Sequence, residues 1–116
     1  MKFVSIWKPD PQIWAAAPDE KQMAAMGQLI GELMNAGVLL DTGGVSDGGL
    51  SLRVQRTGGK LTVTDGPFAE TKELVGGFAI FKVNSKDEAV ELTRRFLEIA
   101  GDGMSELHEV SDFELS

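Results

Sequence analysis

The sequence predicts an α+β fold in which an antiparallel sheet carries two helices on one face. Two segments with apolar residues at helical spacing alternate with short β-branched and aromatic segments. Glycine makes up 14 of the 116 residues, roughly twice its average share, and it clusters in the middle of the chain, which indicates turns and strands there. The length and the 42% hydrophobic content are typical of one globular domain, which we expect to span residues 1–116.

A first strand is predicted at residues 2–7 (KFVSIW), because this run is β-branched and aromatic. Residues 8–18 follow as a loop that holds three of the four prolines and Trp14. A helix then begins at Pro18, with Ala17 as a poor N-cap, and Gly37 supplies its stop. Its apolar face, which we interpret as core, consists of Met23, Met26, Ile30, Leu33, Met34 and Gly37.

The middle of the chain predicts one strand followed by a two-stranded hairpin. Residues 38–40 open the second strand. Residues 50–56 (LSLRVQR) alternate apolar and polar side chains, which predicts a strand with one buried face. Gly58-Gly59 can supply the positive φ angles of a hairpin turn, so residues 61–64 are expected to return as the partner strand.

The last third predicts a strand, a helix and a strand. Residues 74–83 (LVGGFAIFKV) form the strand, in which Gly76-Gly77 indicates a bulge or a close backbone approach. Residues 85–88 (SKDE) match a capping box, and residues 105–113 form the final strand. The helix between them has an apolar face of Ala89, Leu92, Phe96 and Ile99.

Without the hairpin, this order is βαββαβ, the pattern of a ferredoxin-like sandwich. Two helices then cover one face of the sheet, and the other face stays apolar. We assign Phe3, Ser5, Trp7, Phe78 and Ile80 to that uncovered face. An apolar face of this kind needs a partner, so we expect a homodimer packed sheet to sheet.

Charge and composition exclude several classes of function. The net charge is −7, and nearly all of the excess lies in the second half, which disfavours nucleic acid and anionic membrane surfaces as partners. The absence of cysteine excludes disulfides and thiolate metal sites. The first ten residues (MKFVSIWKPD) are too short an apolar run for a signal peptide or a membrane span, so a cytoplasmic location is expected. No cofactor is expected either.

The segment TDGPFAETKE (residues 64–73) has two interpretations. As a corner, Asp65 bonds its own backbone, Gly66-Pro67 restricts the turn, and Phe68 anchors it in the core. As a site, the same loop lines a small-molecule pocket, or Asp65 acts as a general base.

The charged end of this segment also has two interpretations. In one helical turn, Glu70 and Glu73 lie on one side and form an acid–base pair. Alternatively they are solvated and balanced by Lys72. Their spacing with Asp65 matches no known metal loop, so no metal site is predicted.

Three further side chains are candidates for a site. His108, the one histidine, lies among carboxylates and can serve as a base, although the sequence does not decide which face of its strand it occupies. Arg53 is able to bind a ligand carboxylate, or it is an exposed strand residue. Trp7 and Trp14 cap a pocket, or Trp7 alone packs in the dimer face.

The string Asp65-Gly66-Pro67-Phe68, followed by residues 69–73 (AETKE), resembles the signature of the DGPF-domain branch of the YCII-related family. Residues 36–40, 58–60 and 85–89 are similar to the same family. The resemblance implies a ferredoxin-like fold and a dimeric α+β barrel. Some relatives are associated with sigma factors, and one removes HCl from a chlorinated hydroxyhydroquinone. The His–Asp pair proposed as a site in the wider family does not carry over, because the first helix here has Gln22 and Met23 and no histidine.

We therefore expect a small cytoplasmic homodimer that holds a small molecule in a cleft between the sheet, the helices and the loop of residues 65–73. Whether it is an enzyme stays open. Lyase or dehydrohalogenase-like proton transfer would use Asp65 or His108 as base, with Lys72 or Arg53 steadying negative charge. The ligand-binding candidates are Arg53, Phe68, Glu70, Lys72 and Glu73. The alternatives are a non-catalytic regulatory or protein-interaction module, for example one linked to sigma-factor regulation, and a plain dimeric scaffold.

Overall fold

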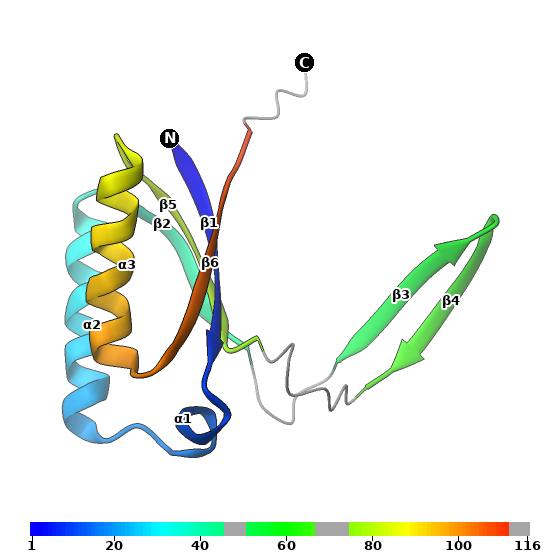
Figure 1. The fold of residues 1–116 in the computed structure, drawn as a ribbon, viewed down its shortest axis with the longest axis horizontal. Coiled ribbons are helices and arrows are strands. Elements are labelled where there is room, and N and C mark those ends of the chain that lie inside the picture. Colours follow the sequence, from blue (N-terminus) through cyan, green and yellow to red (C-terminus); the bar gives the residue numbers. More distant parts are fainter. Residues whose placement is uncertain (46–50, 67–74, 112–116) are drawn as a thin grey trace.

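The computed structural model describes residues 1–45, 51–66 and 75–111. A four-stranded sheet has the order β2-β5-β1-β6, and β3 and β4 form a separate two-stranded sheet. Figure 1 shows α2 and α3 together on one face of the larger sheet. The elements are β1 (Lys2–Pro9), α1 (Pro11–Ala15), α2 (Glu20–Asn35), β2 (Leu39–Gly44), β3 (Leu52–Thr57), β4 (Lys60–Asp65), β5 (Gly77–Lys82), α3 (Lys86–Ala100) and β6 (Gly103–Glu109).

The sheet topology confirms the predicted fold class. β1 lies in the centre and pairs antiparallel with both β5 and β6, while β5 also pairs antiparallel with β2. With the hairpin set aside, the chain runs β1-α2-β2-β5-α3-β6, which is the ferredoxin-like arrangement.

The core lies between the sheet and the two long helices. Phe3 of β1 stands opposite Phe81 of β5, and their rings stack with centroids 5.9 Å apart. Leu29 and Leu33 of α2 pack onto this pair from the helix layer. The rest of the buried cluster is Leu39, Val83 and Ala89.

Helix α2 begins later than predicted, and its buried face is rotated. The N-cap is Asp19 rather than Ala17, because Asp19 Oδ1 accepts a hydrogen bond from the Gln22 backbone N–H at 2.7 Å. Leu29, absent from the predicted face, is buried, whereas Met23 and Met34 are 61% and 48% exposed. The two methionines lie at the flanks of the apolar face, where spacing alone does not separate buried from exposed positions.

The predicted capping box opens α3. Ser85 Oγ accepts from the Glu88 backbone N–H at 3.1 Å, and Glu88 Oε2 accepts in return from the Asn84 backbone N–H at 3.2 Å. Ala89 is buried at the start of this helix. The other predicted core residues, Leu92, Phe96 and Ile99, are partly buried against the core, so the expected apolar face of α3 is confirmed.

Part of the predicted loop at residues 8–18 is helical instead. Asp10 caps the short helix α1, and its Oδ1 accepts from the Gln12 backbone N–H at 2.9 Å. Pro11 occupies the first turn, where its missing N–H costs no hydrogen bond and its fixed φ favours the helix. The prolines therefore start a helix here rather than only ending a strand.

The β3-β4 hairpin has the predicted turn but not the predicted burial. Gly58 and Gly59 have φ angles of 58° and 80°, as the tight turn requires. Every residue of both strands is exposed, so the expectation of one buried face in β3 is wrong. In Figure 1 the hairpin projects away from the four-stranded sheet, which explains why its alternating side chains are not covered.

The prediction of which residues lie on the uncovered face is correct for β5 and wrong for β1. Phe78 and Ile80 do lie on the side of the sheet away from the helices, opposite Ile6 and Val4 of β1. The assignment of Phe3, Ser5 and Trp7 to that side is wrong, because Phe3 packs in the core. Side chains alternate along a strand, so Ser5 and Trp7 lie on the same face of β1 as Phe3, toward the helices. The side chains on both faces of β1 are largely apolar, so the sequence pattern alone did not determine which face of the strand points to the helices.

No helix in the described ranges combines the length and the apolar character needed to cross a membrane.

Candidate functional site

A cavity of about 620 Å³ lies between the inner face of the sheet and the helices α2 and α3. Small side chains in the middle of the sheet create it. Ser5 stands opposite Ala79, between the large Phe3–Phe81 pair on one side and Trp7 on the other. The inner face is therefore hollow at its centre, and α2 spans the hollow with Met26 and Leu29. Residues 16–18 and Ile13 of α1 line one end.

An aromatic pair forms part of the wall. The ring of Trp7 in β1 meets that of Phe96 in α3 edge to face, with centroids 5.5 Å apart. Gly76 makes room for the indole, since a Cβ at this position would lie 2.7 Å from Trp7 Cε3 and 2.7 Å from Pro9 Cδ. The Gly76 backbone N–H also donates to Trp7 O at 2.7 Å. A Cβ at Gly77 would lie 2.8 Å from the backbone oxygen of Gly43, so the close backbone approach predicted for Gly76-Gly77 is confirmed.

The polar groups that the described residues contribute to the lining are uncharged. Gln22 Nε2 donates to Ile99 O at 2.9 Å, Thr42 Oγ1 to Phe78 O at 2.9 Å, and Thr93 Oγ1 to Ala89 O at 2.8 Å. Ser5, 8% exposed, adds a hydroxyl at the floor. No Asp, Glu, Lys, Arg or His occurs among the lining residues in the described parts of the chain. The amide and hydroxyl oxygens therefore offer hydrogen bonds without charge.

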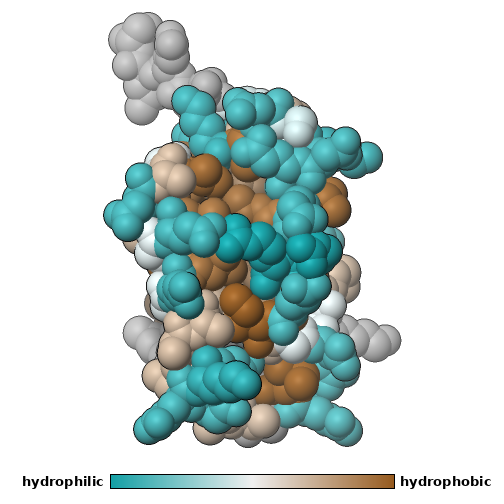
Figure 2. Space-filling view, turned by 90° about the vertical axis from the view of Figure 1, so that its left-hand side faces the viewer, coloured by the Kyte–Doolittle hydropathy of each residue, from teal (hydrophilic) through white to brown (hydrophobic). Residues whose placement is uncertain are grey.

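Charged side chains occupy the outer surface of the helix layer instead. Figure 2 shows this side, with hydrophobic side chains visible between hydrophilic ones. Arg95 of α3 donates from Nη1 and Nη2 to both carboxylate oxygens of Glu32 in α2, at 2.7 and 3.1 Å. Hydrogen bonding from Arg95 lowers the pKa of Glu32, and hydrogen bonding to Glu32 raises the pKa of Arg95. This bidentate pair joins α2 to α3 at the exposed surface of the helix layer.

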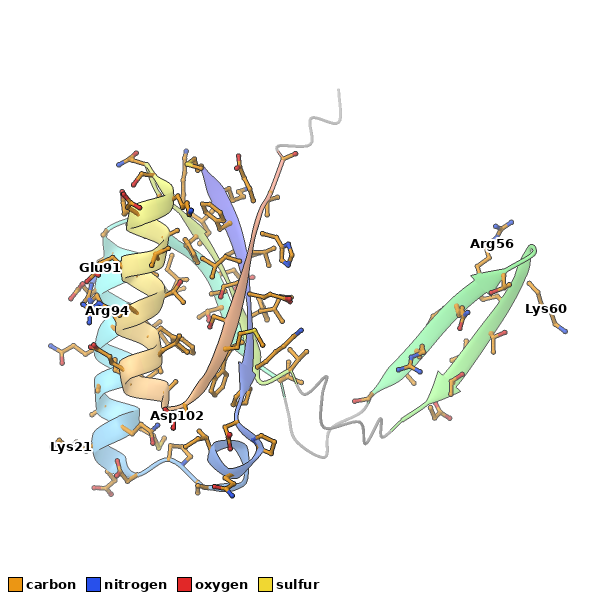
Figure 3. All side chains as sticks on the ribbon, in the orientation of Figure 1. Lys21, Arg56, Lys60, Glu91, Arg94 and Asp102 are labelled. Carbon is orange, nitrogen blue, oxygen red and sulfur yellow. The ribbon has the colours of Figure 1, made fainter. Side chains whose placement is uncertain are left out.

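A second ion-pair group runs along α3. Arg94 bonds both Glu91 and Glu98, one turn away on each side. Its hydrogen bond lowers the pKa of Glu91. Figure 3 shows Glu91 and Arg94 on the side of α3 away from the sheet. This group supports the helix surface and contributes nothing to the cavity wall.

Asp65 and Arg53 lie in the hairpin rather than at the cavity. Asp65 ends β4 opposite Leu52, and Arg53 of β3 stands opposite Thr64. The Gly66 backbone N–H donates to Ser51 O at 2.8 Å, which closes the base of the hairpin. The remaining predicted residues of this segment, Pro67, Phe68, Glu70, Lys72 and Glu73, lie outside the described residues, as does the Trp14 side chain.

His108 faces away from the cavity. Its neighbour Leu107 packs against the core, so alternation along β6 places His108 and Glu106 on the uncovered face of the sheet. His108 Nε2 lies 3.9 Å from Glu106 Oε2, which also pairs with Lys8 Nζ at 3.2 Å. Asp65 and His108 thus belong to different sheets, and the structure does not bring the two proposed bases together.

The sequence interpretation missed the residues that form the cavity floor. Ser5 lies between Phe3 and Trp7 on the inner face of β1, and Ala79 lies next to Phe81 on the inner face of β5, so each is a small residue beside large ones. This contrast of size is a readable signal once the register of β1 and β5 is known. The described residues include no cluster of three or more His, Asp or Glu side chains that could hold a metal ion.

A family model for the YCII-related domain matches residues 1–114. The chain belongs to the YCII-related family. An uncharacterised protein of Rhizobium meliloti (strain 1021) is 31% identical to this YCII-related protein over 81 residues. That match covers 70% of the chain but 65% of the Rhizobium protein, so the relative extends beyond the shared part.

A solved structure of similar fold is the 5-chloro-2-hydroxyhydroquinone dehydrochlorinase of Burkholderia phenoliruptrix AC1100, in complex with 2,5-dihydroxybenzoquinone. It superimposes with a TM-score of 0.52 at 16% identity, over 96% of this YCII-related protein and 94% of the dehydrochlorinase. This similarity shows a common fold.

Proposed function

We propose that this YCII-related protein binds a small, uncharged and largely apolar molecule in the cavity between the sheet and the helices α2 and α3. The observation behind the proposal is that the described residues of the lining are uncharged. A charged ligand would lose its hydration there without meeting an opposite charge among the described lining residues, and that loss is costly. Ser5 and Thr93 leave hydroxyl oxygens at the wall for one or two hydrogen bonds to a ligand.

The size of the cavity also favours a ligand. Small-molecule sites are commonly about 300–1,000 Å³ and mostly apolar, with a few polar groups. At about 620 Å³, this cavity lies within that range. The cavity is partly open to solvent, as a small-molecule site must be for its ligand to enter.

The aromatic wall suggests the shape of the ligand. Trp7 and Phe96 present ring edges and faces suited to a planar ring. The dehydrochlorinase of similar fold is described in complex with a six-membered-ring compound, 2,5-dihydroxybenzoquinone. We therefore favour a ligand built on one or two aromatic or quinonoid rings.

Binding is better supported than catalysis. The proton transfer expected from the sequence needs a base near the ligand, and the described cavity lining has no titratable side chain. Roles for Asp65, His108, Arg53 and Lys72 in a dehydrohalogenase-like reaction stay predictions, as does a cleft lined by residues 65–73.

We further propose that the protein is a homodimer packed sheet to sheet. Val4 and Ile6 of β1 and Ile80 of β5 are partly buried on the uncovered face, and Phe78 is 38% exposed beside them. Met104 of β6 is exposed on the same face, and the Lys8–Glu106 ion pair lies between it and Ile6. A second copy covering Val4, Ile6, Phe78 and Ile80 would remove apolar surface from water.

Two naphthalene derivatives of similar shape test the ligand class. At neutral pH, 2-naphthol is uncharged and 2-naphthoate is an anion. We expect 2-naphthol to bind, measured by isothermal titration calorimetry, and 2-naphthoate to bind about tenfold or more weakly. Ala79→Leu fills the cavity floor and should weaken 2-naphthol binding about tenfold, whereas Ala24→Leu on the exposed surface of α2 should leave it unchanged. Equal binding of both compounds, or no effect of Ala79→Leu, would contradict the proposal.

A further inference from the structure

The β3-β4 hairpin has one apolar face that is exposed. Residues directly opposite in an antiparallel pair point to the same side, and Val54 stands opposite Val63. Leu52 and Leu61 lie on that side by alternation. Their direct partners lie there as well, Asp65 opposite Leu52 at the base and Arg56 opposite Leu61 near the turn. The four side chains are 52%, 60%, 64% and 58% exposed, in the order Leu52, Val54, Leu61 and Val63. The opposite face is polar, with Gln55 and Thr62 at its centre.

Within one copy, little covers this apolar face. Each hairpin strand contacts its partner strand extensively, and neither has comparable contacts with another described element. A two-stranded hairpin is marginally stable in water unless its apolar face packs against something. A regular hairpin with four large apolar side chains on one side therefore indicates a surface that is covered in the assembled protein.

Charge identifies the kind of partner. Residues 51–66 contain Arg53, Arg56 and Lys60 against Asp65, a surplus of two positive charges. The whole chain has a net charge of −7, so the rest of the chain carries −9, that is −7 less the +2 of the hairpin. On the apolar face Arg56 and Asp65 balance each other, so the surplus lies with Arg53 and Lys60 on the polar face. This surplus attracts the hairpin over long range to a second copy of the same acidic chain, while the contact itself is made by the apolar side chains.

The direction of the hairpin identifies where that copy lies. In Figure 1, α2 and α3 lie on one side of the four-stranded sheet, and the hairpin projects on the other side. The uncovered apolar face, with Val4, Ile6, Phe78 and Ile80, is on the hairpin's side. A second copy stacked on that face comes within reach of the hairpin.

We propose that the hairpin of each copy packs its apolar face onto the second copy of a homodimer, as a reciprocal clasp. This inference rests on the sheet-to-sheet homodimer proposed above and adds a second contact to it. A twofold axis makes the two clasps equivalent, so each copy gives one hairpin and receives one.

Isosteric substitutions in the full-length chain test the clasp. Val54→Thr with Val63→Thr keeps side-chain shape and β-branching but makes the centre of the apolar face polar. We expect the dimer dissociation constant, measured by analytical ultracentrifugation, to rise about tenfold or more. Thr62→Ser with Thr64→Ser on the polar face is the matched control and should change it less than about twofold. Circular dichroism checks that both variants keep the fold.

The outcomes separate the clasp from the dimer. A dimer whose dissociation constant is unchanged by Val54→Thr/Val63→Thr overturns the clasp and leaves the sheet-to-sheet dimer standing. A native protein that is monomeric at millimolar concentration overturns both. Hydrogen exchange gives a second readout, because the amides of residues 52–65 should gain protection as dimer forms. Protection in the hairpin that does not depend on protein concentration would also overturn the clasp.

Discussion

The rings of Trp7 and Phe96 stand at 89° to each other with centroids 5.5 Å apart, and this contact joins the central strand to α3 at the wall of the cavity. Phe96→Leu removes the ring pair and part of the wall. We expect it to lower the free energy of unfolding by about 1–2 kcal/mol and to weaken 2-naphthol binding. Urea denaturation and calorimetry measure the two effects. Val90→Leu, at an exposed position of the same helix, should change stability by less than about 0.5 kcal/mol.

Gly76 is required by close approach rather than by backbone conformation. An alanine Cβ there would lie 2.7 Å from Trp7 Cε3, so Gly76→Ala should shift the indole and cost about 1–3 kcal/mol of stability. Gly27 in α2 is the matched control, since a Cβ there meets nothing within 4 Å. Gly27→Ala should therefore raise stability by about 0.5–1 kcal/mol through helix propensity. Thermal unfolding of both variants checks the contrast, and destabilisation by Gly27→Ala of the same size would refute it.

The Glu32–Arg95 pair predicts a pH dependence of stability. Hydrogen bonding from Arg95 lowers the pKa of Glu32 in the folded protein from its usual 4.5. The carboxylate therefore stabilises the fold above about pH 4.5, and this contribution is lost as the pH falls through the lowered folded value. Glu32→Gln should remove this part of the pH dependence. Arg95→Gln should remove the same part, and the double variant should lose no more than either one, measured by urea denaturation across that range.

Two substitutions test which residue caps the N-terminus of α2. Asp19→Ala removes the acceptor for the Gln22 backbone N–H and should cost about 1 kcal/mol. Ala17→Ser places a good capping residue at the position expected from the sequence, two residues outside the observed cap, and should leave stability unchanged. A stabilising Ala17→Ser with a neutral Asp19→Ala would place the cap at residue 17 instead.

Much of the fold could be predicted because local chemistry specifies it. The Gly58-Gly59 turn, the Ser85–Glu88 capping box and the apolar face of α3 each depend on a few neighbouring residues. Which face of β1 points to the helices could not be predicted in the same way. Its two faces, Phe3-Ser5-Trp7 and Val4-Ile6, are both largely apolar, and the neighbouring strands and helices decide which is inner.

The candidate site was harder to predict than the fold. The sequence drew attention to charged residues such as Asp65 and His108, which lie in the hairpin and on the uncovered face. The cavity instead depends on small residues, Ser5 and Ala79, that become neighbours only through the register of β1 with β5. A void is a property of three-dimensional packing, so single-residue chemistry does not reveal it.

The most direct test of the ligand site is a methyl-detected NMR titration with 2-naphthol. We predict that chemical shifts change for the methyl groups of Met26, Leu33 and Leu92, which line the cavity, and that Val54 in the hairpin and Met104 on the uncovered face stay unchanged. Shift changes confined to Val54 and Met104, with the cavity methyls unaffected at saturating 2-naphthol, would contradict the account.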